Sequence, residues 1–95
     1  MEYITFMHSN TDTEPSRESW DAFFQMVRKS GLFRGGSAIG ARSTVGTKAV
    51  PDVTNHIDGY MRFDADNLEE LEDLLKSHPT IISGGSIEVC ELPKS

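Results

Sequence analysis

Two histidines of this chain stand where a catalytic side chain would be useful. His78 directly precedes Pro79, a position at which helices end, and the near-neutral pKa of imidazole suits general acid–base catalysis. The structural alternative is an imidazolium ion that stabilises the carboxyl end of that helix. His8 closes an alternating segment, where it either points into a pocket shared with His78 or marks the place at which a strand meets water. We take His78 and His8 as the candidate catalytic residues.

The potential metal ligands are scattered along the sequence. A metal site would need several of His8, His56, His78, Cys90 and the nearby acids to converge. Their spacing matches no ligand motif, because zinc ligands usually occur in close pairs. We therefore expect no metal site and no cofactor. His56 lies in a polar stretch and is predicted at the surface, and Cys90 is either a small buried apolar side chain or a reactive thiol.

A basic residue and two glycines form a candidate ligand-binding site. Arg34 precedes Gly35 and Gly36. Glycines let a ligand approach exposed backbone amides, and a guanidinium binds carboxylates and phosphates. The alternative is a bulge in a strand, and no phosphate-loop spacing is present. Arg34, Gly35 and Gly36 are therefore candidate ligand-binding residues, and a strand bulge is the alternative explanation.

Two further side chains complete the candidate ligand-binding set. Trp20 lies on a helical apolar stripe, where its indole either packs in the core or forms a pocket wall. Asp58 lies at the approach to an alternating strand and shares a face with Tyr60 and Arg62. For Arg62, a cross-strand ion pair or a contact between subunits is a simpler explanation than ligand binding.

Composition limits the class of protein. The 95 residues fit one domain, 1–95, and carry a net charge of −6. Six acids and no base lie between Asp64 and Asp73, which indicates a solvated helix face. Such a surface repels phosphate backbones, so we expect no nucleic-acid partner. One cysteine, no signal peptide and no stretch long enough to span a bilayer predict a cytoplasmic protein without membrane contact.

Hydrophobic periodicity predicts four strands and two helices in the order βαββαβ. Period-two alternation marks the strands, and apolar stripes of period 3.6 mark the helices. An excursion over residues 46–55 separates the middle strands, and a loop with a buried anchor at Ile81 and Ile82 precedes the last one. The predicted strands are residues 3–8, 32–42, 57–63 and 87–92, and the predicted helices run from Thr13 or Ser16 to Lys29 and from Asp66 to Ser77 or His78.

End signals support both helices. Thr13 or Ser16 caps the first helix, Pro15 suits its first turn, and Gly31 ends it in a left-handed conformation. Asp66 forms a capping box with the glutamate three residues later at the start of the second helix. The predicted buried face of that second helix consists of Leu68, Leu71, Leu74 and Leu75.

This element order predicts an α+β, ferredoxin-like fold. Right-handed crossovers place both helices on one face of a four-stranded antiparallel sheet. The first strand is nevertheless apolar on both faces, because Ile4 and Phe6 alternate with Tyr3 and Met7. In a single copy the face without helices would be an exposed apolar patch. A second copy packed on it removes the patch, so we expect a homodimer.

Two stretches, GLFRGGSAI over residues 31–39 and IDGYMRFDADNLEELEDLLKSHPTIISGGSIEVCEL over residues 57–92, carry a family resemblance. The chain resembles the YCII-related family of dimeric α+β barrel proteins over most of its length. The shared features are a glycine-rich second strand, an aromatic third strand, a second helix ending before proline, and a Gly-Gly turn. The resemblance implies a dimer with a pocket between sheet and helices, and in some members an enzyme that uses a His–Asp pair.

That pair is absent at the corresponding positions. The family's histidine corresponds to Ser19 or Trp20, its acid to His78, and the Asp-Gly-Pro-Phe stretch of one branch to residues 55–59. The sequence is therefore consistent with two functions. The first is an enzyme or small-molecule-binding protein whose pocket lies near His8, Trp20, Arg34 and His78. The second is a non-catalytic dimerisation or accessory module.

Overall fold

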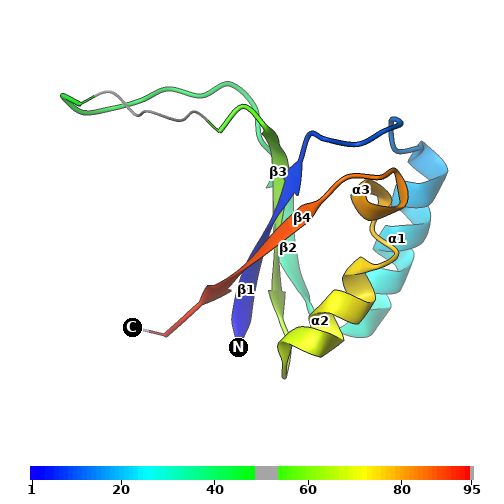
Figure 1. Cartoon of the computed structure of the whole chain (residues 1–95). Coiled ribbons are helices and arrows are strands. Elements are labelled where there is room, and N and C mark those ends of the chain that lie inside the picture. Colours follow the sequence, from blue (N-terminus) through cyan, green and yellow to red (C-terminus); the bar gives the residue numbers. More distant parts are fainter. Residues whose placement is uncertain (49–53, 95) are drawn as a thin grey trace.

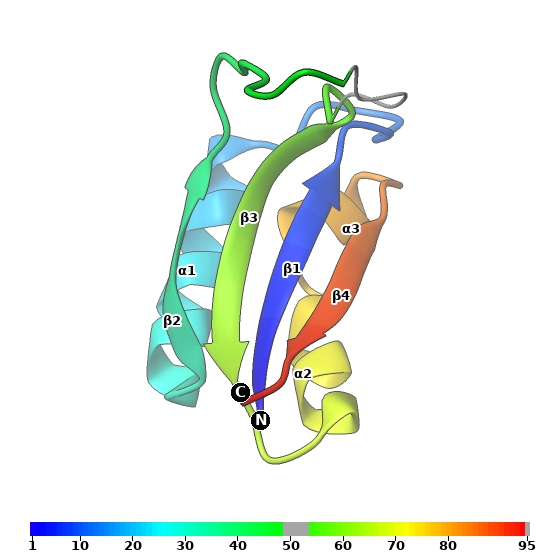
Figure 2. The same ribbon diagram turned by 90° about the vertical axis from the view of Figure 1, so that its left-hand side faces the viewer.

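Four antiparallel strands form one sheet in the order β2-β3-β1-β4, with the helices on one face (Figures 1 and 2). The computed structural model describes residues 1–48 and 54–94. The predicted α+β class and βαββαβ order are confirmed, with one added turn of helix before the last strand. The elements are β1 (Glu2–His8), α1 (Arg17–Ser30), β2 (Phe33–Ala38), β3 (Ile57–Asp64), α2 (Leu68–Leu75), α3 (Pro79–Ile82) and β4 (Ile87–Leu92).

Strand alternation divides the sheet into a helix-covered face and an open face. In β1, Tyr3, Thr5 and Met7 are buried beneath the helices, whereas Ile4 and Phe6 are half-buried on the open face. The hydroxyl of Thr5 donates to the carbonyl of a neighbouring β3 residue at 3.0 Å, so its burial leaves no polar group unpaired. The fully buried apolar side chains of the core are Phe23, Val27, Phe63 and Leu71.

Helix α1 starts and ends at the residues that its sequence signals allow. Ser16 is the N-cap, and its hydroxyl accepts from the backbone N–H of Ser19 at 3.1 Å. The alternative cap, Thr13, and the placement of Pro15 in the first turn are wrong, because the helix begins after both residues. Gly31 adopts φ +73°, the left-handed conformation predicted for the end of the helix.

Helix α2 begins one residue later than its predicted capping box. The N-cap is Asn67, whose side-chain oxygen accepts from the N–H of Glu70 at 2.9 Å, so the prediction of Asp66 as cap is wrong. Leu68 is the first residue of the helix and is 40% exposed, while Leu71 is fully buried. The buried face of the helix is therefore narrower than the leucine pattern predicts.

A one-turn helix replaces the loop predicted between α2 and β4. His78 is the N-cap of α3, and Pro79 occupies its first turn. Ile81 and Ile82 are not the predicted buried anchor, because Ile82 is 63% exposed and Ile81 lies at the edge of a surface groove. Pro79 and Thr80 are buried in their place.

Strand β2 is shorter than predicted and ends at Ala38 instead of Arg42. Its pairing with β3 shifts register between Phe33 and Gly36, which is the predicted bulge, and Gly35 there has φ +107°. Residues 39–48, named the arm below, then run away from the sheet on the side opposite the helices (Figure 1). The rest of the predicted excursion includes residues 49–53, which lie outside the described residues.

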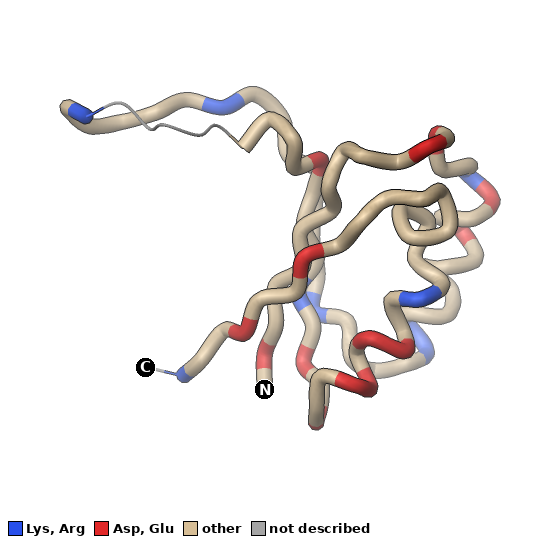
Figure 3. The backbone as a smooth tube through the Cα atoms, in the orientation of Figure 1, with Lys and Arg blue, Asp and Glu red and all other residues tan. Residues whose placement is uncertain are grey.

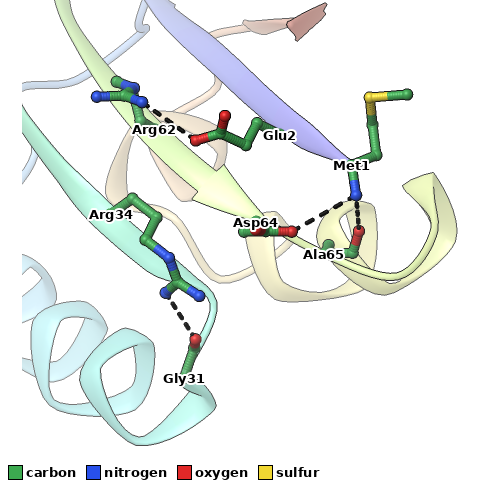
Figure 4. A network of polar contacts seen from close by, with 7 residues as sticks. All are labelled: Met1, Glu2, Gly31, Arg34, Arg62, Asp64 and Ala65. Atoms are coloured by element: carbon green, nitrogen blue, oxygen red, sulfur yellow. Dashed lines mark hydrogen bonds and ion pairs between the residues drawn. The ribbon is translucent and has the colours of Figure 1, made fainter. Parts of the chain in front are cut away.

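Polar contacts join β1 and β3 at the end of the sheet where the chain begins (Figure 4). Arg62 donates to the carboxylate of Glu2 on the adjacent strand at 3.2 Å, which is the predicted cross-strand ion pair. The terminal amino group of Met1 lies 3.5 Å from the Asp64 carboxylate.

Within residues 1–48 and 54–94, every helix is too short or too polar to cross a bilayer.

Candidate functional site

A cavity of about 560 Å³ lies between α1 and the β2-β3 half of the sheet. Helix α1 and strand β2 supply its walls, β3 its floor, and the β1–α1 loop its rim, with single contributions from β1 and α3. The lining residues are Met7, Thr11, Glu14, Pro15, Trp20, Phe24, Phe33, Gly36, Ser37, Ala38, Asp58, Gly59, Tyr60, Met61 and Thr80.

Glycine backbone forms part of the cavity floor. A Cβ atom at Gly36 would lie 2.9 Å from the Cα of Met61 and still nearer the carbonyl oxygen of Tyr60. At Gly59 a Cβ would lie 2.8 Å from the Met7 methyl carbon and 2.9 Å from a backbone oxygen of β2. Because backbone atoms cannot yield as a flexible side chain does, both positions require glycine. Asp58 and Tyr60 flank Gly59, and strand alternation directs their side chains to the open face. Their backbone atoms are therefore the part that borders the cavity.

Aromatic rings form the cavity wall. Trp20 and Phe24 stack on successive turns of α1, with ring centroids 5.7 Å apart and an interplanar angle of 25°. Phe33 of β2 continues the wall with its ring 6.4 Å from that of Phe24. The guanidinium of Arg28 lies 5.6 Å from the Phe24 ring centroid, in cation–π range. The wall therefore presents flat, polarisable surface to a ligand.

The cavity rim is hydrogen-bonded to the turn before β4. The N–H of Asp12 donates to the carbonyl of Ser83 at 2.8 Å, and the N–H of Ser86 donates to the side-chain oxygen of Asn10 at 2.9 Å. Gly84 has φ +89°, and a Cβ there would collide with the Asp12 carboxylate. The Gly-Gly turn thus lets the rim loop dock closely. Glu14 lies on this rim, and the described lining includes no lysine, arginine or histidine.

His78 lies behind the cavity wall instead of in it. The residue is 1% exposed, and its ring packs 4.7 Å from that of Phe23 and 5.0 Å from that of Trp20. Its Nδ1 accepts the backbone N–H of Thr80 at 3.0 Å, which assigns the remaining proton to Nε2. Burial lowers the pKa of His78 to about 4, so the imidazole is neutral at pH 7.

The structural alternative for His78, an imidazolium ion at the carboxyl end of α2, is wrong. The residue is instead a neutral hydrogen-bond acceptor at the start of α3. Nε2 is buried and has no hydrogen-bond partner among the described residues. An unpaired N–H donor next to two aromatic rings is an uncommon and costly arrangement. Trp20 and Thr80 separate it from the cavity that both of them line.

His8 occupies the open face, on the other side of the sheet from the cavity. Its Nε2 lies 3.3 Å from Oε1 of Glu88, and its ring lies 5.3 Å from that of His56. The Cys90 thiol is 3.8 Å from the other carboxylate oxygen of Glu88, and burial together with that carboxylate raises the pKa of the thiol. Among the described residues, no group of three or more His, Cys, Asp and Glu side chains is arranged to hold a metal ion.

Arg34 also lies apart from the cavity. Its guanidinium donates to the carbonyl of Gly31 at 2.8 Å and to that of Phe33 at 3.1 Å, so it closes the end of α1 (Figure 4). Gly35 belongs to the strand bulge, which was the alternative to an anion site. Neither residue borders the cavity.

The structure therefore brings together only some of the predicted site residues. Trp20, Gly36 and Asp58 border one cavity, with His78 one layer behind them, whereas His8, Arg34 and Gly35 lie elsewhere. Sequence reasoning missed the remaining wall and rim residues, chiefly Phe24, Phe33, Met61, Glu14 and Thr80. A glycine at position 59 within an alternating strand was the available signal for the bare floor.

Comparison with known proteins gives a likeness of fold. No protein-family model matches the chain, and no curated protein matches it. A solved structure that does match is the 5-chloro-2-hydroxyhydroquinone dehydrochlorinase TftG from Burkholderia phenoliruptrix AC1100, in complex with 2,5-dihydroxybenzoquinone. The match has a TM-score of 0.59 and 13% identity, and covers 100% of this chain and 96% of that one. This chain thus has an α+β fold similar to that of the dehydrochlorinase, and the likeness concerns the fold alone.

Proposed function

We propose that this protein binds a small, uncharged, ring-bearing molecule in the cavity between α1 and the β2-β3 half of the sheet. The observation that carries the proposal is a cavity of about 560 Å³ walled by aromatic side chains. Ligand pockets in proteins typically span about 300–1,000 Å³ and are mainly apolar, with a few polar groups that orient the ligand. The stacked rings of Trp20 and Phe24 offer an aromatic ligand the offset or edge-on contacts that rings prefer.

The charge of the lining favours a neutral ligand over an anion. Glu14 lies on the rim, and the described lining offers no cation to a carboxylate or phosphate. Thr11 and Thr80 can donate or accept hydrogen bonds at ring substituents. The structural neighbour TftG was solved with 2,5-dihydroxybenzoquinone, a compact oxygenated ring, and an uncharged ring of similar size suits the volume and lining of this cavity.

Binding is the part of the function that the geometry supports most directly. His78 remains our candidate for acid–base chemistry because it carries a neutral N–H without a partner among the described residues, one layer behind Trp20. Proton transfer to a ligand would require the Trp20 side chain to move aside. His8, on the opposite face, would serve a different site.

Isothermal titration calorimetry tests the proposal with hydroquinone as the neutral ring and benzoate as the anion. We expect saturable binding of a neutral ring and weaker binding of benzoate. Phe24→Ala should weaken the neutral ring about tenfold, since it removes one aromatic contact surface worth about 1.4 kcal/mol. Met26→Ala is the matched control, because Met26 is 38% exposed on the same helix and lies outside the cavity lining. Absence of binding at millimolar concentration, or equal affinity in Phe24→Ala, would contradict the proposal.

We also propose that the chain is a YCII-related protein and forms a homodimer through the open face of its sheet. The supporting observation is an apolar row, Ile4, Phe6, Tyr60, Cys90 and Leu92, that no described helix covers. A non-catalytic accessory role would need this interface alone, without an occupied cavity.

The single cysteine fits the reducing cytoplasm, and the net charge of −6 argues against a nucleic-acid partner.

Phe6→Asp tests the sheet-to-sheet pairing. Phe6 lies on the open face, paired with Tyr60 of β3 and Glu88 of β4, so a buried aspartate there would face a second copy. We expect the dimer dissociation constant to rise about 30-fold, roughly 2 kcal/mol, as measured by sedimentation velocity. Leu68→Asp, on the helix-covered side of the molecule, should leave the constant unchanged. A wild-type chain that sediments as a monomer at micromolar concentration would rule out the pairing.

A further inference from the structure

The base of the arm, residues 39–48, is firmly anchored to the sheet. The guanidinium of Arg42 donates to Thr54 Oγ1 at 3.0 Å, to the carbonyl of Gly40 at 3.2 Å, and to the carbonyl of Ile57. The N–H of Ile39 donates to the carbonyl of Asp58 at 2.9 Å. One arginine thus joins the chain that leaves β2 to the chain that returns to β3. Because both legs are fixed at the base, the sheet determines the direction of the arm.

Beyond its base, the arm leaves the body of its own subunit. Figure 1 shows it extending from the end of the sheet on the side of the open face, away from all three helices. Residues 43–48 make no hydrogen bond to the described helices or strands. Val45 is 95% exposed, which is unusual for a β-branched apolar side chain. A single copy gives these residues no packing partner among the described residues.

The arm and the rest of the chain carry opposite charge. Residues 39–48 contain two bases, Arg42 and Lys48, and no acid, whereas residues 1–38 and 54–94 hold seven bases and fourteen acids. Figure 3 shows basic positions and no acidic position on the arm, whereas the body carries both kinds, with the acidic positions in excess. A basic arm is attracted to an acidic body of this kind, and its own body lies behind it.

We infer that the arm docks on a second copy of this chain, the one that packs against the open face. The inference rests on the proposed homodimer and adds a second contact to it. The open face and the arm form two sides of one corner (Figure 1), so a subunit seated on the sheet also lies along the arm. In a two-fold dimer each copy gives one arm and receives one. Val45 then packs on the partner, and Lys48 faces its acidic surface.

Substitutions in the arm test this contact without touching the sheet. Val45→Asp and Lys48→Glu should each raise the dimer dissociation constant about tenfold in sedimentation velocity, because they place negative charge against an acidic partner. The effect of Lys48→Glu should diminish at 1 M salt, where charges are screened beyond about 3 Å. Ile82→Asp is the matched control, since Ile82 is 63% exposed on α3, on the far side of the molecule.

A photo-crosslinking amino acid at position 45 identifies what the arm touches. The experiment mixes ¹⁵N-labelled and unlabelled protein, so that mass spectrometry separates crosslinks between copies from crosslinks within one copy. We expect crosslinks between copies. A dimer with an unchanged dissociation constant in both arm variants and crosslinks only within one copy would overturn the arm contact while leaving the sheet pairing intact. A monomeric wild-type protein would overturn both, and the ligand titration of the cavity is independent of either result.

Discussion

Leu71→Ala is expected to lower the free energy of unfolding by about 3 kcal/mol. Leu71 is fully buried beneath the sheet, in one cluster with Tyr3, Phe63 and Leu75. Removing its branched end loses the transfer free energy of three carbon atoms and leaves a cavity that the neighbouring rings and strands cannot fill. Urea denaturation followed by circular dichroism measures the difference, and an unchanged slope with a lower midpoint would indicate that only stability has changed.

Leu68→Ala is the matched control for that substitution. The two leucines lie nearly one turn apart on the same helix and undergo the same chemical change, but Leu68 is 40% exposed. We expect Leu68→Ala to cost less than about 1 kcal/mol, within the range of ordinary surface changes. Equal losses at both positions would mean that α2 is rotated relative to the sheet, with Leu68 in the core.

Stability is expected to fall by about 3 kcal/mol between pH 6.5 and pH 4 because of His78. Burial lowers the pKa of this imidazole from 6.5 to about 4 in the folded chain. Between these values the unfolded chain binds a proton that the folded chain does not, so the free energy of unfolding decreases as the pH falls. The contribution is fully present above pH 6.5 and is lost at about 1.4 kcal/mol per pH unit below it.

His78→Asn isolates this pH dependence from other acid effects. An asparagine side chain can still accept the N–H of Thr80 as an N-cap, but it does not titrate. The variant is less stable because it leaves a void beside Phe23 and Trp20, and the slope between pH 6.5 and 4 should be smaller by about one proton. His56→Gln, on the exposed approach to β3, should retain the slope. A slope unaffected by His78→Asn would show that this histidine is solvated in the folded chain.

The fold could be predicted because its signals are long and repeated. Alternation over β1, β3 and β4 and the apolar stripe of α1 specify elements whose packing follows from topology rules. The errors lie at element ends, where two residues compete for one role. Asp66 and Asn67 are both residue types that favour the N-cap position, and the structure has Asn67 as the N-cap of α2. A proline after His78 indicates where a helix ends, but not that the next turn is itself helical.

The site was harder to predict, because a cavity wall and a core are built from the same residue types. Phe24, Phe33 and Met61 match the core pattern, and only the packing of the whole chain shows that a space remains between them. Alternation did contain the information that separates His8 from the cavity, since His8 follows Met7 and faces the other way. The neutrality of His78 depends on burial by Phe23 and Trp20, which spacing in the sequence does not reveal.

The glycine floor of the cavity has a consequence for how this protein can diverge. Positions 36 and 59 accept no side chain, so natural variation cannot reshape the cavity from beneath. New ligand preferences must arise from exchanges at the walls and rim, at Trp20, Phe24 and Glu14. A lineage that exchanges these residues and retains both glycines would acquire new preferences on an unaltered scaffold.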